Sequence, residues 1–230
     1  MRKTVIIVLL VLVLSLSFAF AQDSDSKKFV ESIRIGGGYD LMYASGKFDE
    51  GKTAFDNSKF GFGLSAGVAF DLSAIPNFLT EGWYSYMGLD FFFSNGFKFK
   101  GEKHPTETET VKGSVGMKGH LILMRHHTFD TKFNFYFGGG LSFDWMTGKL
   151  IDGVQEETKS VTAWGIALYA EASYKIVNHI SVDLTVIPDI TLITNMQSAL
   201  ELDGYKRIET RTGFGFGVSL SAKLGLKYIF

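Results

Sequence analysis

The residues with the clearest potential for chemistry are His179 and Ser181, with Asp183 two positions further along the chain. On a β-strand alternate side chains share a face, so a base, a nucleophile and a carboxylate would stand in one row. The competing interpretation is a turn histidine followed by a serine that faces the inside of the fold. We favour that interpretation and predict no catalytic residues.

The other histidines and the glycine runs give weaker indications of a functional site. His126 and His127 lie in an expected turn at 125–131, and His104 lies in an expected loop. Adjacent histidines on a strand point to opposite faces, so no two of these form a ligand pair, and we predict no metal and no cofactor. The runs 36–38 and 138–140 lack the strand-to-helix context of a phosphate cradle and predict space and curvature.

A third group consists of charged residues that fall on the small, polar side of alternating segments. The basic members are Arg34, Lys118, Lys175, Lys223 and Lys227, and the acidic members are Asp40, Asp90, Asp144, Glu171 and Asp183. One interpretation is a polar path for a solute or a proton. Equal numbers of each sign favour a salt-bridged plug instead, because unpaired buried charges are costly.

These charges must be positioned by strands, because the segments around them alternate with a period of two. From Phe214 to Phe230 the even positions are all nonpolar or aromatic, and seven of the eight odd positions are small or charged. Residues 132–145 repeat this pattern, with Phe133 and Phe137 on one face and Tyr136 and Asp144 on the other. Weaker copies span 31–47, 59–72, 83–99, 110–124, 161–175 and 180–194, which makes eight strands.

Glycine and charge on one face and aromatic residues on the other indicate a sheet that is apolar on its outside. The pattern predicts an all-β fold, a closed eight-stranded antiparallel transmembrane β-barrel with an up-and-down meander. We expect long polar loops at about 48–58, 100–110, 148–160 and 195–210, and short turns at 125–131 and 175–179. The segment 71–82 is an unusually long, partly apolar turn.

The N-terminus predicts export. Two basic residues precede an apolar run and the small residues Ala19 and Ala21, so residues 1–21 read as a cleaved signal peptide, with an uncleaved anchor as the alternative. Residues 22–30 are then a short periplasmic segment and 31–230 the barrel. Without Arg2 and Lys3, 21 of the 23 basic residues remain against 24 acidic ones, which makes nucleic acid an improbable partner. The chain has no cysteine, which excludes disulfides and a lipid-bearing N-terminal Cys.

The terminal run Leu224, Leu226, Tyr228 and Phe230 resembles the assembly signal of bacterial outer-membrane proteins. With eight strands, the mature chain resembles the small-barrel superfamily of OmpX, OmpW and opacity-protein types. The resemblance implies an outer-membrane location with periplasmic termini, contact with outer-membrane lipid, and recognition by periplasmic chaperones and the barrel-assembly machinery. His179 and Ser181 also resemble the base and nucleophile of lipid A deacylase barrels, but those enzymes act at the outer leaflet and this pair lies beside an inner turn.

Members of this superfamily have unrelated functions, so fold does not choose among them. We expect a non-enzymatic barrel with a charge-plugged lumen and a structural or adhesin-like role, whose polar loops contact a host or extracellular ligand. The alternatives are a narrow OmpW-type channel for small apolar solutes, a lipid-modifying enzyme, and a soluble lipid-carrying barrel.

Overall fold

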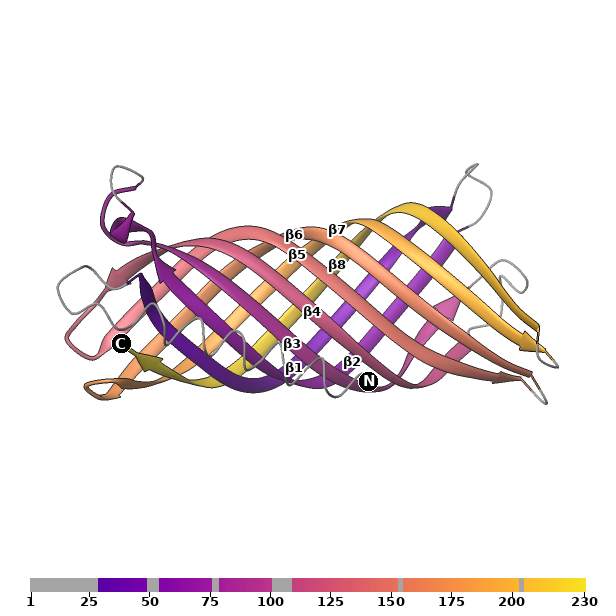
Figure 1. The fold of residues 1–230 in the computed structure, drawn as a ribbon, viewed down its shortest axis with the longest axis horizontal. Coiled ribbons are helices and arrows are strands. Elements are labelled where there is room, and N and C mark those ends of the chain that lie inside the picture. The colour runs from indigo at the N-terminus through magenta and orange to yellow at the C-terminus, as the bar shows by residue number, and fades with distance from the viewer. Residues whose placement is uncertain (1–28, 49–53, 76–78, 101–108, 153–154, 203–204) are drawn as a thin grey trace.

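The computed structural model describes residues 29–48, 54–75, 79–100, 109–152, 155–202 and 205–230. They form eight antiparallel strands that close into a barrel, as the alternation predicts (Figure 1). The strands are β1 Val30–Phe48, β2 Ala54–Asp71, β3 Trp83–Lys100, β4 Glu109–Thr128, β5 Phe133–Asp152, β6 Gln155–Val177, β7 Ile180–Leu202 and β8 Tyr205–Ile229. A single 3₁₀ turn, η2 Leu72–Ala74, follows β2, and no helix in the described part of the chain is long and apolar enough to cross a membrane.

Each strand pairs with the next, and β1 pairs with β8 to close the ring. The C-terminus and the β2–β3, β4–β5 and β6–β7 connections lie at one end of the barrel, on the left in Figure 1. We call this the terminal end and the opposite one the distal end. Closure gives every strand two neighbours, so no sheet edge is left open.

The barrel is apolar outside and largely polar inside. Along β8 the even positions from Phe216 to Tyr228 are exposed and the odd positions from Gly217 to Lys227 are buried. Large apolar side chains such as Ile35, Leu141 and Leu224 cover the exterior. The predicted direction of the alternation, with aromatic and aliphatic residues outward, is therefore confirmed.

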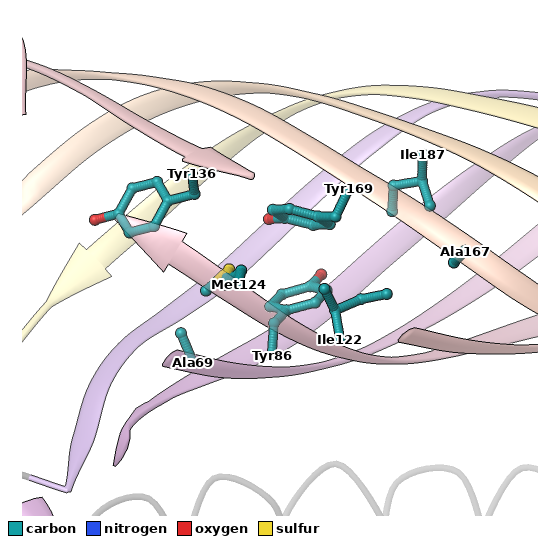
Figure 2. Close-up of a cluster of buried hydrophobic side chains, with 8 residues drawn as sticks. All are labelled: Ala69, Tyr86, Ile122, Met124, Tyr136, Ala167, Tyr169 and Ile187. Carbon is teal, nitrogen blue, oxygen red and sulfur yellow. The ribbon is translucent and has the colours of Figure 1, made fainter. Parts of the chain in front are cut away.

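Four inner glycines and an apolar cluster shape the lumen. A Cβ on Gly138 or Gly140 would clash with a backbone oxygen of β4, so close backbone approach requires glycine there, beyond the predicted space and curvature. The cluster fills a section of the lumen with three tyrosine rings and smaller side chains (Figure 2). Its members are Ala69, Tyr86, Ile122, Met124, Tyr136, Ala167, Tyr169 and Ile187. Glycine at positions 67 and 88 makes this packing possible, because a Cβ on Gly67 or Gly88 would clash with the Tyr86 ring.

The strands extend further toward the distal end than predicted. The expected loop at 148–160 is wrong, because β5 and β6 stay paired out to Asp152 and Gln155. The expected loop at 195–210 is wrong for the same reason, because β7 and β8 pair out to Leu202 and Tyr205. The backbone hydrogen bonds continue through segments in which polar and apolar residues no longer alternate, so hydropathy does not reveal them. The expected turn at 125–131 is also shorter, since His126 and His127 belong to β4.

Candidate functional site in the lumen

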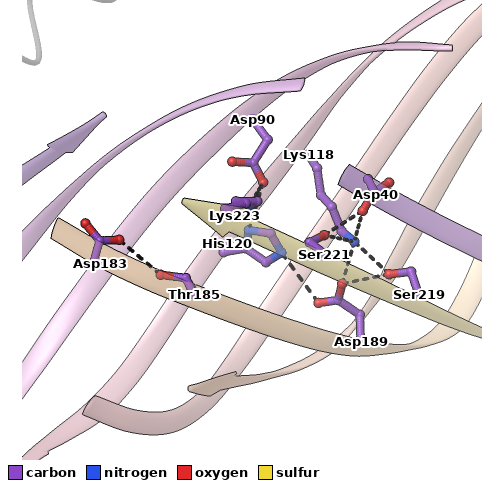
Figure 3. A network of polar contacts seen from close by, with 10 residues as sticks. All are labelled: Asp40, Asp90, Lys118, His120, Asp183, Thr185, Asp189, Ser219, Ser221 and Lys223. Carbon is purple, nitrogen blue, oxygen red and sulfur yellow. Dashed lines mark hydrogen bonds and ion pairs between the residues drawn. The ribbon is translucent and has the colours of Figure 1, made fainter. Parts of the chain in front are cut away.

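Lys118 of β4 is the centre of the lumen network. Its Nζ lies 3.2 Å from Asp40 Oδ1 on β1 and 2.5 Å from Asp189 Oδ2 on β7. It also donates to the hydroxyl oxygens of Ser219, at 2.6 Å, and Ser221, at 3.3 Å, on β8. Figure 3 shows the ammonium group enclosed by these four side chains. The residue is only 1% exposed, so a full positive charge is held inside the barrel by partners from three other strands.

A second ion pair joins Lys223 of β8 to Asp90 of β3. His120 lies between this pair and the Lys118 cluster, with Nδ1 3.6 Å from Asp90 and Nε2 3.5 Å from Asp189 (Figure 3). The imidazole therefore separates two carboxylates that would otherwise face each other. The three ion pairs of Lys118 and Lys223 form one continuous group across the lumen together with His120.

Two more ion pairs lie toward the terminal end. Arg34 of β1 contacts Asp183 of β7, and Lys227 of β8 contacts Glu171 of β6. Lys227 Nζ also lies 3.9 Å from the centre of the Tyr136 ring. The Tyr169 hydroxyl donates to Glu171, which thus has two partners. These pairs connect the charged section of the lumen to the apolar cluster.

All these ion pairs join strands that are not neighbours in the ring. The pairs of Lys118 and Lys223 join strands three positions apart in the ring and cross the interior, whereas the Arg34 and Lys227 pairs each bridge one intervening strand. Beside Asp90 and Lys223 a cavity has a volume of about 10 Å³, enough for roughly one water molecule. The ion pairs cross-link the strands of the barrel.

Nine of the ten predicted lumen charges are buried inside the barrel: Arg34, Asp40, Asp90, Lys118, Asp144, Glu171, Asp183, Lys223 and Lys227. Asp144 faces Lys118 in the register of β4 and β5. Lys175 differs, because it lies half-buried two residues before the end of β6, at the terminal rim. No ion pair of its side chain is found within the described ranges.

Sequence reasoning missed His120 and Asp189. Both continue an alternation already in use, since His120 is two residues after Lys118 and Asp189 is six residues after Asp183. Counting in steps of two would have found them. It would not have found Glu31, which accepts a hydrogen bond from the Tyr136 hydroxyl at 3.3 Å, because a register shift between Val30 and Ser32 interrupts the alternation there.

The structure separates the residues that resemble a hydrolase. Ser181 is 0% exposed inside the barrel, whereas the His179 ring is exposed and stacks on Tyr228 on the outer face. Asp183 is engaged by Arg34. His179 and Ser181 do not share a face, because His179 precedes β7 and takes no part in its alternation.

The two adjacent histidines point to opposite faces of the wall. His126 stacks on Tyr136, with ring centres 4.6 Å apart, and its Nε2 lies 2.9 Å from Asn134 Oδ1. His127 lies against Phe129 instead, with ring centres 5.1 Å apart. Among the residues whose placement is described, no group of three His, Cys, Asp or Glu side chains is arranged to hold a metal ion.

The residues of the predicted assembly signal lie on the last strand. Leu224, Leu226 and Tyr228 are exposed on the outer face, and the backbone N–H of Phe230 donates to Glu31 O at 3.0 Å. The expected cleavage site at Ala19 and Ala21 lies outside the described residues, as do most of 22–30 and residues 101–108.

No protein-family model matches this chain, and no curated protein matches it. Solved structures do. A major outer membrane protein from Thermus thermophilus superposes with a TM-score of 0.56 and 14% identity, covering 84% of this chain and 99% of that one. The outer membrane protein OprG from Pseudomonas aeruginosa superposes with a TM-score of 0.52 and 13% identity, covering 88% of this chain and 97% of that one. The resemblance to small outer-membrane barrels is thus confirmed at the level of the fold.

Proposed function

We propose that the chain is an integral outer-membrane barrel whose lumen is closed by its own ion network, and that it has a structural or surface-interaction role without catalysis. In this proposal residues 1–21 direct export, the termini are periplasmic, and the barrel-assembly machinery inserts the chain. The apolar exterior supports a membrane location, because bilayer-spanning barrels are apolar outside and polar within.

The main observation in support of a closed lumen is that the Lys118 side chain contacts carboxylates on two distant strands. Its ammonium group meets Asp40 and Asp189, which belong to strands on either side of the β1–β8 closure. The Lys223–Asp90 pair crosses the lumen beside it, and the tyrosine-rich cluster fills the adjacent section. These paired charges and packed rings support a lumen without a continuous column of water, so we expect neither ions nor small apolar solutes to pass.

The test is conductance of the purified protein in planar bilayers. We expect no steady conductance from the wild type, and measurable conductance from Lys118→Ser/Lys223→Ser, which removes both crossing cations and leaves hydrated carboxylates. Leu121→Ala, an outward position on the same strand as Lys118, is the matched control and should stay closed. Steady conductance of the wild type would overturn the plug in favour of a channel. Hydrocarbon uptake into vesicles containing the wild type would favour the apolar-solute channel.

The surface-interaction role has its own test. Cells that produce the protein with residues 101–108 replaced by a Gly-Ser linker should adhere less to extracellular matrix than cells with the wild type, at equal surface levels. Equal adhesion of the two kinds of cell would contradict the surface-interaction role and favour a purely structural one. A changed lipid A profile in overproducing cells would contradict the absence of catalysis.

A further inference from the structure

Arg125 of β4 presents a cation on the outer face of the barrel wall. The outward alternation of β4 runs through Leu121, Leu123 and Arg125, all of them exposed. Arg125 pairs in register with Trp83 of β3 on one side and with Phe137 of β5 on the other. Its guanidinium carbon lies 5.7 Å from the centre of the Trp83 ring. An arginine therefore lies over the ring of Trp83, beside Phe137 in register, on a face that is largely apolar.

Within the described residues, Arg125 differs from the lumen cations because no acidic partner of its side chain is found. Arg34, Lys118, Lys223 and Lys227 each contact a carboxylate, whereas no ion pair or hydrogen bond of the Arg125 side chain is found in the part of the chain that is described. The ring of Trp83 orients the guanidinium without consuming its N–H donors. Those donors remain available to a ligand from outside the protein.

The position of Arg125 along the wall indicates where that ligand would lie. Toward the middle of the barrel, Leu121, Leu123 and Met87 of β3 are exposed apolar side chains. Toward the terminal end, His127 follows on the same face, and the exposed Phe129 marks the β4–β5 turn. Arg125 thus lies where the apolar surface ends and the turns begin. In a bilayer this boundary corresponds to the headgroup layer, in which aromatic girdles lie.

From this arrangement we infer that Arg125 and Trp83 form a binding site for the phosphate group of a phospholipid, with His127 beside it. The guanidinium fork binds the phosphate oxygens through two parallel N–H donors. The acyl chains then lie along Leu123 and Met87. This inference rests on the proposed membrane location, and it adds a specific lipid contact at one place on the circumference.

The test is a titration of the purified protein in detergent with phosphatidylglycerol, followed by native mass spectrometry. Arg125→Gln should weaken binding of the first lipid roughly tenfold, because a charge-assisted pair is lost. Arg125→Lys, which keeps the charge without the fork, should weaken it by a smaller factor. Leu121→Gln changes an outward residue of the same strand without touching a cation, and it should bind lipid as the wild type does.

Equal lipid binding by Arg125→Gln and wild type would overturn the inference. Equal weakening in Leu121→Gln would also overturn it, because it would show unspecific adhesion to the outer face. Binding of inorganic phosphate as tight as that of phosphatidylglycerol would overturn it too, because it would show a site for the free anion that gains nothing from the lipid chains. Each variant is also reconstituted into vesicles and tested for flotation and heat-modifiable migration. A protein that inserts normally but shows no Arg125 effect refutes the lipid site alone, whereas failure of the wild type to insert refutes the proposed function.

Discussion

Replacing Lys118 by methionine tests whether the lumen network stabilises the barrel. The substitution keeps a long side chain but removes the charge that meets Asp40 and Asp189. Removing one member of a buried ion pair costs roughly 3–5 kcal/mol, because the opposite charge stays buried without its partner.

The contacts that survive place the expected loss at the lower end of this range. The Ser221 hydroxyl still donates to Asp40 at 2.5 Å, and the Ser219 hydroxyl still donates to Asp189 at 2.7 Å. Each stranded carboxylate therefore keeps a donor, and a hydrogen bond to a charged group offsets about 1.5–3 kcal/mol of the cost of burial. We expect Lys118→Met to lower the free energy of unfolding by about 3 kcal/mol.

The assay is urea unfolding in lipid vesicles, followed by tryptophan fluorescence and analysed by linear extrapolation. Lys132→Met, at an exposed turn position, is the control and should change stability by less than about 0.5 kcal/mol. Adding Asp189→Leu to Lys118→Met should recover part of the loss, since it removes a stranded charge. Coincident unfolding curves for Lys118→Met and Lys132→Met would refute the reasoning, because the network would then contribute nothing to stability.

The remaining predictions concern the wall, a turn and the last residue. Gly140→Ala should lower stability by roughly 1–3 kcal/mol, because its Cβ would clash with the backbone of β4, whereas Gly119→Ala meets nothing within 4 Å and should be neutral in the same urea assay. Leu220→Lys should cost roughly 2–4 kcal/mol on the lipid face, with Leu220→Met as control; equal stability would mean that this face does not contact lipid. Two backbone N–H groups in its turn hold the pKa of Asp130 below its usual value, so its contribution is present above the unfolded pKa of roughly 3.9 and is lost as the pH falls through the folded value. The urea midpoint of Asp130→Ala should therefore be lower than that of the wild type at pH 7 and equal to it in strong acid; a constant difference would contradict this. Deleting Phe230 should reduce the heat-modifiable protein in outer-membrane fractions with little change in synthesis, and normal levels would rule out its role in assembly.

The strands could be predicted wherever one face is lipid-like and the other polar. The run from Phe216 to Tyr228 alternates without interruption, and the structure places its two sets of side chains outside and inside as expected. Toward the distal end the prediction ended too early, as at Asp152 and Leu202, because polar and apolar residues no longer alternate there, as in Leu150-Ile151. Backbone hydrogen bonds hold those hairpins together, and such bonds cannot be recognised from the hydropathy of the side chains.

The identity of the lumen residues could also be read from the sequence, but their partners could not. Alternation states that Lys118 faces inward, yet it does not state that a residue on β4 meets Asp189 on β7. That pairing depends on strand tilt and on the length of each side chain. The apolar cluster around Tyr86 and Tyr169 was not predicted, because the inward positions were expected to be small or charged.

The ion pairs across the lumen also bear on how the barrel folds. Asp40 and Ser221 are 181 residues apart in sequence, and Lys223 meets Asp90 across 133 residues. Such contacts form only after the final strand has arrived beside the first, since no hairpin contains both partners. Long-range pairings of this kind slow folding. A nascent barrel would therefore hold its lumen charges hydrated until closure, and expulsion of that water would coincide with the step that joins β8 to β1.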